Sequence, residues 1–281
     1  MLQSQNYLVN GRFEGVLTPF DRGFAYGDGV FRTLVLQLGV PHCWLHHYRK
    51  LEEDCNALRI VCPAQETLRG DIASLVHEAD EHLQAIIKII ITRGESARGY
   101  ALPPLAQPTR IVAKTAMPQY PETNFDQGIT LHLCQTRLAR QPKLAGVKHL
   151  NRLENILARM EWVDPHIADG LMLDEGGDVI ECISGNVFAR FGDQLTTPDL
   201  SQCGVAGVTR ARIMGLAPIL GYDLEVRHLR LSELMDADEV IVCNSLYGAW
   251  QVLHLANHTW QAGVLAAKLR ERLRQDDTIS A

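Results

Sequence analysis

The sequence has little positive charge and, in particular, little lysine. Its 281 residues include 27 lysines and arginines against 33 aspartates and glutamates, which gives a formal net charge of −6. Only six of the basic residues are lysines. Non-specific nucleic-acid binding needs clustered positive surface, so this balance argues against a nucleic-acid partner.

Long apolar segments and a secretory signal are also missing. The apolar run AIIKIIIT is far too short to cross a bilayer and carries Lys88. The N-terminal stretch MLQSQNYLVNGRFEG lacks the basic start and apolar centre of a signal peptide. We therefore expect a cytoplasmic protein with no membrane partner.

Cysteine pairs and metal-ligand spacings do not occur. The seven cysteines are odd in number, are scattered without a CxxC pair, and mostly lie within apolar runs. They are typical of reduced core residues in a cytosolic protein. The eleven histidines form no HExxH or comparable spacing, so no metal site is expected.

Composition and patterning predict an α+β fold in two domains. The chain is 46% apolar and 21% charged, close to globular averages, and is long enough for one large or two ordinary domains. Hairpin signals are mixed with helical patterns, without a regular βαβ alternation. The proline-rich segment MPQYPETNFDQG is the best linker candidate, which gives domains at 1–117 and 128–281 and a linker at 118–127.

Apolar periodicity and turn signals place the main elements. Helices are predicted over 44–59, 64–83, 149–163, 207–220 (ended or bent by Pro218) and 262–275. Strands or hairpins are predicted over 6–16, 30–44, 85–94, 109–116, 129–136, 169–182, 186–198, 222–229 and 238–245.

Lys148 is the most unusual of the few lysines. It would lie just before the helix predicted over 149–163, whose apolar stripe comprises Leu150, Leu153, Ile156, Leu157 and Met160. Positive charge is unfavourable near a helix N-terminus, and a lysine kept there from water would have a lowered pKa and a more nucleophilic amine. A solvated flank is the ordinary alternative, and position alone favours it.

Further features could bind an anion. The turn CGVAGVTRARIMG opens a helix near Val208 and Thr209, where backbone N–H groups and the helix dipole suit a phosphate. Arg49, in HHYRKLEED, could hold a phosphate or carboxylate bidentately. Arg93 and Arg98, in the loop ITRGESARGY, would suit a dicarboxylic substrate. Each also has an ordinary explanation, as a strand-to-helix turn or as solvated surface residues.

Glu181 adds a carboxylate. It alternates with apolar residues on a predicted strand that leads into the small loop Ser184-Gly185-Asn186, where it could meet a ligand or simply face solvent. A lysine, a carboxylate and a phosphate-binding helix start are together the parts that a pyridoxal phosphate enzyme needs.

At this point the sequence resembles a known family. The segments YGDGVFRT, HHYRKLEE, GVKHLNRLENILAR, VIECISGNVF, GVTR and DEVIVCNS resemble, in order, the motifs of the fold-type IV (class IV aminotransferase-like) pyridoxal phosphate enzymes. The resemblance implies a small α/β N-terminal domain, a larger C-terminal cofactor-binding domain with a barrel-like sheet, and a homodimer.

The resemblance also implies roles for single residues. Lys148 would carry pyridoxal 5′-phosphate and act as the base, and Glu181 would pair with the ring nitrogen. Arg49, Val208 and Thr209 would hold the phosphate, with Asn244 close to it. Thr33 matches a threonine implicated in proton handling.

KHLNRLE, RGY and Thr33 are most similar to the lyase group of this family, which converts 4-amino-4-deoxychorismate to 4-aminobenzoate and pyruvate in folate synthesis. An aminotransferase acting on D-amino or branched-chain amino acids is the alternative. A non-catalytic anion-binding module is a third hypothesis, but it leaves the contexts of Lys148 and Glu181 unexplained.

Overall fold

The computed structural model describes residues 6–76 and 84–279. The chain forms two compact units. Within the described residues, the first extends to Pro118 and also includes Val147–Asn151, and the second comprises Gln119–Gly146 and residues 152–279. The segment Val147–Asn151 belongs to the first unit, although the residues on both sides of it belong to the second. A single boundary at 118–127 could not predict this.

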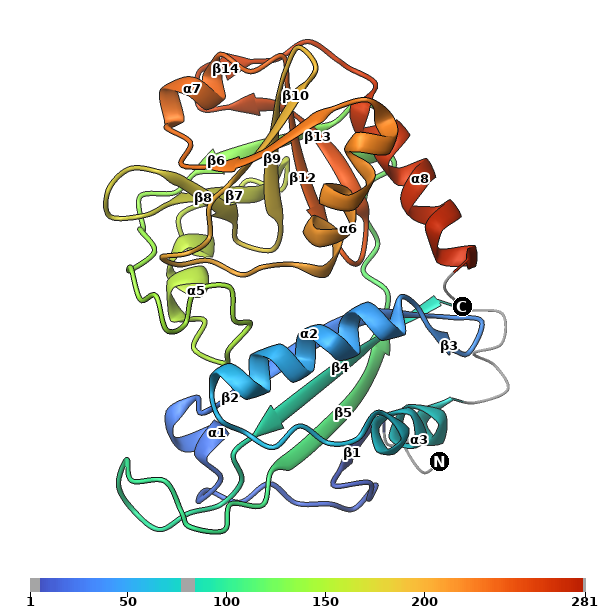
Figure 1. Cartoon of the computed structure of the whole chain (residues 1–281), viewed down its shortest axis with the longest axis vertical. Helices are drawn as coiled ribbons and strands as arrows, with labels where there is room; N and C mark the ends of the chain where they lie inside the picture. The colour runs from blue at the N-terminus through green and yellow to red at the C-terminus, as the bar shows by residue number, and fades with distance from the viewer. Residues whose placement is uncertain (1–5, 77–83, 280–281) are drawn as a thin grey trace. The chain divides into compact units, whose positions relative to one another are not determined.

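The first unit is built on a five-stranded antiparallel sheet in the order β1-β5-β4-β2-β3. Its strands are β1 (Tyr7–Val9), β2 (Gly29–Gln37), β3 (Val40–Pro41), β4 (Gln84–Thr92) and β5 (Thr109–Ala116). Its helices are α1 (Arg22–Tyr26), α2 (Trp44–Ala57) and α3 (Gln65–Leu75). Figure 1 shows α2 lying over the strands of this sheet.

One face of the small sheet forms the core of the first unit. Alternate residues of β2 and β4, such as Leu34 and Ile89, pack with Leu51 of α2 and Ile72 of α3. The other face therefore carries the intervening residues of both strands, because successive side chains point to opposite sides.

The second unit contains a nine-stranded mixed sheet in the order β11-β10-β9-β12-β13-β6-β7-β8, with β14 beside β13. Its strands are β6 (Ile129–Leu133), β7 (Ile167–Leu173), β8 (Val179–Cys182), β9 (Asn186–Phe191), β10 (Gln194–Pro198), β11 (Asp223–Arg227), β12 (Glu239–Asn244), β13 (Gly248–Leu255) and β14 (His258–Thr259). Because β8 also pairs with β9, the strands from β6 to β9 close with β12 and β13 into a barrel.

Helices cover the outside of this barrel. They are α4 (Thr123–Asp126), α5 (Leu153–Arg159), α6 (Val208–Leu216), the 3₁₀ turn η2 (Pro218–Leu220), α7 (Leu231–Met235) and α8 (Leu265–Ile279). On β12, Val240 and Val242 face the barrel interior, whereas Ile241 packs against α6 and α8. No helix among the described residues is long and apolar enough to span a membrane.

Most predicted elements are confirmed. The Asn10-Gly11 turn has positive φ at both residues, and backbone bonds join Val9 to Arg12, as expected for a tight hairpin turn. The helix predicted over 64–83 is confirmed at Gln65–Leu75, and residues 77–83 lie outside the described part. The predicted linker contains α4.

The helix predicted over 149–163 is wrong in length and in its buried face. The helix α5 covers Leu153–Arg159 only, and its buried residues are Asn155 and Ala158. Four residues of the predicted core stripe are instead more than half exposed, as is the following valine: Leu153, Ile156, Leu157, Met160 and Val163. Periodicity identifies an apolar face, but it does not indicate what covers that face.

Candidate functional site

Lys148 lies in an extended segment beside β2. The N–H of Phe31 donates to the carbonyl of Lys148 at 3.0 Å, and the N–H of Leu150 donates to the carbonyl of Gly29 at 2.9 Å. These bonds extend the small sheet at an edge of β2, so Lys148 does not directly precede a helix as the sequence predicted. The lysine is half-buried and held by regular backbone pairing.

Two lysine ammonium groups lie over the aromatic ring of Phe31. The Nζ atoms of Lys148 and Lys88 lie 4.7 Å and 5.1 Å from the ring centroid, within the range of cation–π attraction. Thr33 shares a face of β2 with Phe31 and lies opposite Lys88 in the strand register. The structure thus puts Thr33 on the strand face beside which the Lys148 amine lies. The sequence analysis did not name Lys88 as a candidate site residue. A charged residue within a run of isoleucines was the signal that could have identified it.

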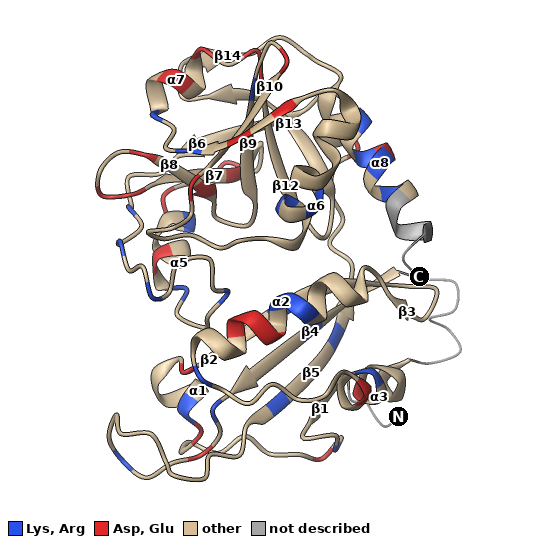
Figure 2. Cartoon of the chain, viewed as in Figure 1, with Lys and Arg blue, Asp and Glu red and all other residues tan. Residues whose placement is uncertain are grey.

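The two neighbouring cations of α2 differ in burial. Arg49, predicted to hold a phosphate, is exposed. The side chain of Lys50 is 17% exposed and pairs with Asp54. Burial, together with the nearby Arg32, lowers the pKa of Lys50 to about 8. Figure 2 shows this basic turn of α2 followed at once by an acidic turn.

A buried ion pair lies between α2 and β2. Asp54 contacts the guanidinium of Arg32 and also accepts the backbone N–H of Lys148 at 3.2 Å. Burial lowers the pKa of Arg32 to about 10. Sequence reasoning missed this pair, although Arg32 interrupts the buried positions Val30 and Leu34 of β2.

Arg93, predicted to bind substrate, is buried and engaged inside the protein. Its guanidinium makes two bonds to Asp28, at 2.8 and 3.0 Å, and donates to the carbonyls of Leu58 and Arg59. Burial tends to raise the pKa of Asp28, but the hydrogen bonds from Arg93 and Arg22 bring it below its ordinary value. Through these contacts Arg93 holds Asp28 and the chain at Leu58 and Arg59 in place.

Arg98 lies exposed on the loop that follows β4. Arg22 supports this loop by donating to the Ser96 hydroxyl at 3.1 Å and to the Gly99 carbonyl at 3.0 Å. The loop therefore presents Arg98 to solvent while its backbone is anchored.

Glu181 is buried on β8 and does not face solvent. Its Oε2 accepts the N–H of Val205 at 2.8 Å and lies 3.5 Å from the amide nitrogen of Asn186. The same Asn186 accepts the N–H of Gly207 at 3.1 Å through its Oδ1. One amide side chain therefore connects the carboxylate to the start of α6.

The N-terminus of α6 has the donors expected of an anion site. Gly207 precedes the helix, and its carbonyl receives the first helical bond, from Ala211. The first N–H groups of a helix have no partner within it. The hydroxyl of Thr209 lies 3.4 Å from that of Ser245. Val208, Thr209 and Ser245 thus lie together at this helix start.

Asn244, predicted near the phosphate, shapes the loop that contains Ser245. Its Oδ1 accepts the N–H groups of Leu246 and Tyr247, and its amide nitrogen donates to the carbonyl of Ser184 at 3.2 Å. Asn244 therefore joins the loop after β12 to the loop after β8.

The described residues fit pyridoxal phosphate. By residue type, the first unit has a half-buried lysine. The second unit has, within itself, a buried carboxylate that Asn186 connects to a helix start with two hydroxyls. Space at that helix start is tight, because a Cβ on Gly207 would approach Asn186 Oδ1 to 2.3 Å. No metal-binding group of His, Cys, Asp or Glu occurs in the described part of the chain.

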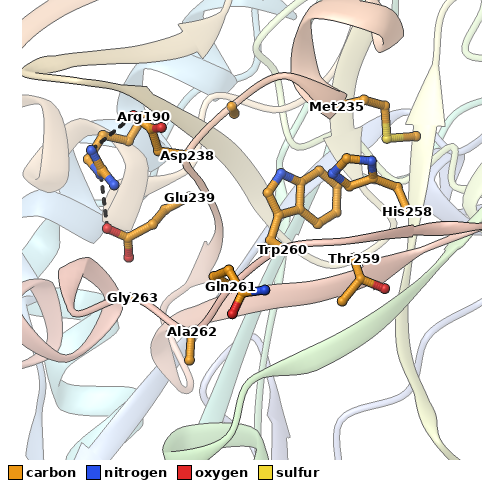
Figure 3. A pocket seen from close by; sticks show the side chains of 11 residues that line it. Arg190, Met235, Asp238, Glu239, His258, Thr259, Trp260, Gln261, Ala262 and Gly263 are labelled. Atoms are coloured by element: carbon orange, nitrogen blue, oxygen red, sulfur yellow. Dashed lines mark hydrogen bonds and ion pairs between the residues drawn. The ribbon is translucent and has the colours of Figure 1, made fainter.

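The second unit also has a cavity of about 460 Å³. Figure 3 shows Arg190 facing Asp238 and Glu239 on one side of it, with His258 and Trp260 on the other. Arg190 pairs with Glu239 at 2.9 Å and with Asp238 at 3.1 Å, so these charges compensate one another. None of the predicted site residues lines this cavity.

Comparisons with known proteins agree with the geometry. The chain is 34% identical to an aminodeoxychorismate lyase of Vibrio harveyi over 95% of this chain and 98% of the relative. A solved 4-amino-4-deoxychorismate lyase from Pseudomonas aeruginosa is 44% identical, with a TM-score of 0.90 over 96% of this chain and 98% of that one. A D-alanine aminotransferase of Listeria innocua is 26% identical over 88% of this chain and 86% of the relative.

The sequence pattern of one family covers most of the chain. The family Amino-transferase class IV matches residues 29–255, a range that begins at the first residue of β2 and ends at the last residue of β13. The chain therefore belongs to the class IV aminotransferase family, the fold-type IV enzymes that depend on pyridoxal phosphate.

Proposed function

We propose that the protein is a lyase that converts 4-amino-4-deoxychorismate to 4-aminobenzoate and pyruvate. The observation that carries this proposal is Thr33, which lies on the strand face next to the Lys148 amine. The Vibrio harveyi and Pseudomonas aeruginosa relatives named for this activity support it.

Lys148 would hold the cofactor and then act as the base. Its amine removes the proton from the amine-bearing carbon of the substrate, and the enolpyruvyl group leaves from the adjacent carbon. When bound, pyridoxal phosphate supplies the electron sink for this step. The Thr33 hydroxyl, which can donate and accept hydrogen bonds, would relay a proton on the same face.

Glu181 would keep the ring nitrogen of the cofactor protonated. A buried carboxylate is suited to this role because it is held by the N–H of Val205 and is shielded from water. The helix start at Val208 and Thr209, with Ser245 and the Asn244 loop, would bind the phosphate. The half-buried ammonium of Lys50 is a stronger candidate for a phosphate contact than the exposed Arg49.

The substrate carboxylates would be bound by exposed cations of the first unit. Arg98 is exposed on an anchored loop, and Lys88 lies opposite Thr33. Arg93 was proposed for the same task, but its donors are occupied by Asp28 and by backbone carbonyls. We therefore assign the carboxylates to Arg98 and Lys88.

Incubating the purified enzyme with 4-amino-4-deoxychorismate, and separately with an amino acid and a keto acid, tests the proposal. We expect 4-aminobenzoate and pyruvate from the first mixture and slow turnover at most in the second. The aminotransferase alternative is favoured by the Listeria innocua relative and predicts the reverse. Rapid transamination without aminobenzoate would reject the lyase.

We further propose a homodimer that buries the exposed apolar face of α5. This face comprises Leu153, Ile156, Leu157 and Met160, with Val163 after it, and each is more than half exposed. Such contiguous apolar surface is typical of an interaction site. Sedimentation should give a dimer for the wild type and a monomer for Leu157→Glu. A wild-type monomer at micromolar concentration would contradict the proposal.

The cellular setting follows from the proposed reaction. An enzyme that makes 4-aminobenzoate would act in folate synthesis, which we propose takes place in the cytoplasm. All seven cysteines are free thiols, five of them buried, and free thiols persist best in a reducing compartment.

A further inference from the structure

Asp54 is fully buried on α2 and lies next to the backbone of Lys148. Its Oδ2 accepts the N–H of Lys148 at 3.2 Å. The same carboxylate contacts the guanidinium of Arg32, on β2, and the ammonium of Lys50, one turn earlier in α2. One side chain therefore connects a helix, a strand and the segment that carries Lys148.

The location of this carboxylate is not explained by stability alone. Removing a carboxylate and a guanidinium from water is costly, and apolar side chains of similar volume often stabilise a core as well or better. Arg32 and Asp54 nevertheless occupy buried positions among Val30, Leu34 and Leu51. What apolar residues could not provide is an acceptor for the N–H of Lys148.

The backbone of Lys148 is fixed on both sides. Its N–H is bound by Asp54, and its carbonyl accepts the N–H of Phe31 at 3.0 Å. With both flanking peptide groups held, the direction of the Cα–Cβ bond is set. The Nζ atom then lies 4.7 Å from the centroid of the Phe31 ring.

We propose that Asp54 is a positioning residue for Lys148. Its carboxylate fixes the N–H of Lys148 and so aims the amine, while Arg32 holds the carboxylate in its place. The inference rests on the proposed role of Lys148 as the amine that carries the cofactor. A displacement of about 1 Å in a reacting group can slow an enzyme about 100-fold, so a backbone anchor at this residue matters.

Two double variants separate the effect of the hydrogen-bond acceptor at position 54 from the effect of the buried ion pair. Arg32→Met with Asp54→Asn, and Arg32→Met with Asp54→Leu, both remove the buried ion pair, so neither leaves an uncompensated charge at these two positions. Asparagine and leucine have nearly the same shape, but only asparagine offers an oxygen to the N–H of Lys148. Glu66→Gln is the control, because this carboxylate lies exposed in the first turn of α3.

Two measurements use the apoprotein. Hydrogen exchange at the Lys148 amide should be about tenfold faster in the leucine variant than in the asparagine variant. The rate at which Lys148 captures added pyridoxal phosphate, located by borohydride reduction and peptide mapping, should be about tenfold slower. In the reconstituted enzyme kcat should fall with little change in KM, and Glu66→Gln should match the wild type.

Equal exchange and capture rates in the two double variants would overturn the role of Asp54. If the leucine variant does not fold, Arg32→Met with Asp54→Ala replaces it, with the same expected differences. Failure of the wild type to capture pyridoxal phosphate at Lys148 would instead reject the proposed function. The exchange comparison would still test whether Asp54 fixes the backbone.

Discussion

Glu161 should make the stability of the protein depend on pH in the acid range. Its carboxylate follows α5 and accepts four hydrogen bonds: from the N–H groups of Gln135 and Thr136, the Thr136 hydroxyl and the His132 ring, at 2.6 to 3.1 Å. Burial raises the pKa of Glu161, but these bonds outweigh burial and lower it from 4.5 to about 2.

The size of the effect follows from this shift. A folded-state pKa this far below the unfolded value of 4.5 corresponds to about 3 kcal/mol of folding stability at neutral pH. Because the folded pKa is the lower one, this stabilisation is complete above about pH 4.5 and is lost as the pH falls toward 2. About half of this stabilisation should remain at pH 3. The side chain is 17% exposed, so little of it is screened by water.

Urea unfolding of the wild type and Glu161→Gln tests this reasoning. The difference in unfolding free energy should be about 3 kcal/mol at pH 7 and about half as large at pH 3. Thr136→Val, which removes one donor of the four, should cost about 1 kcal/mol at pH 7. A wild-type to Glu161→Gln difference that is unchanged between pH 7 and pH 3 would refute the lowered pKa.

Three further predictions concern the site. Glu181→Gln should lower kcat at least about tenfold while pyridoxal phosphate stays bound, because a charge on the cofactor ring is lost; wild-type kcat would remove Glu181 from the site. Lys50→Ala should release the cofactor on dialysis far more readily than Arg49→Ala, because the half-buried ammonium is the stronger phosphate partner; the opposite order would restore Arg49. Thr33→Gly should depress aminobenzoate formation more than transamination, and a parallel fall in both, with a lower melting temperature, would make Thr33 a plain strand residue.

Local signals in the sequence were sufficient for most of the fold. The Asn10-Gly11 turn, the end of α6 before Pro218 and the helix α2 are each determined by residues near in sequence. The pairing of Lys148 with Phe31 was not predictable in this way, because it joins residues far apart in the chain. Apolar periodicity therefore predicted a helix from residue 149, where the chain is extended and the helix begins only at Leu153.

Candidate residues for the site could be selected by residue type, but their environments could not be predicted. Lys148, Glu181 and the Val208–Thr209 turn were chosen as candidates from their motifs, and their roles stay predictions. Whether a cation is exposed, as Arg49 is, or fully engaged, as Arg93 is, depends on partners such as Asp28 that only the folded chain brings together. The buried Asp54 carries no local signal, because its two acidic neighbours suggest a solvated helix face.

The most direct test of the central claim combines cofactor trapping with product analysis. Borohydride reduction of the yellow wild-type enzyme should attach pyridoxal phosphate to Lys148 and no other residue, and should abolish the release of 4-aminobenzoate and pyruvate from 4-amino-4-deoxychorismate. Lys148→Ala should fold, trap no cofactor and form neither product. Trapping at another lysine, or aminobenzoate formation by Lys148→Ala at the wild-type rate, would contradict the account.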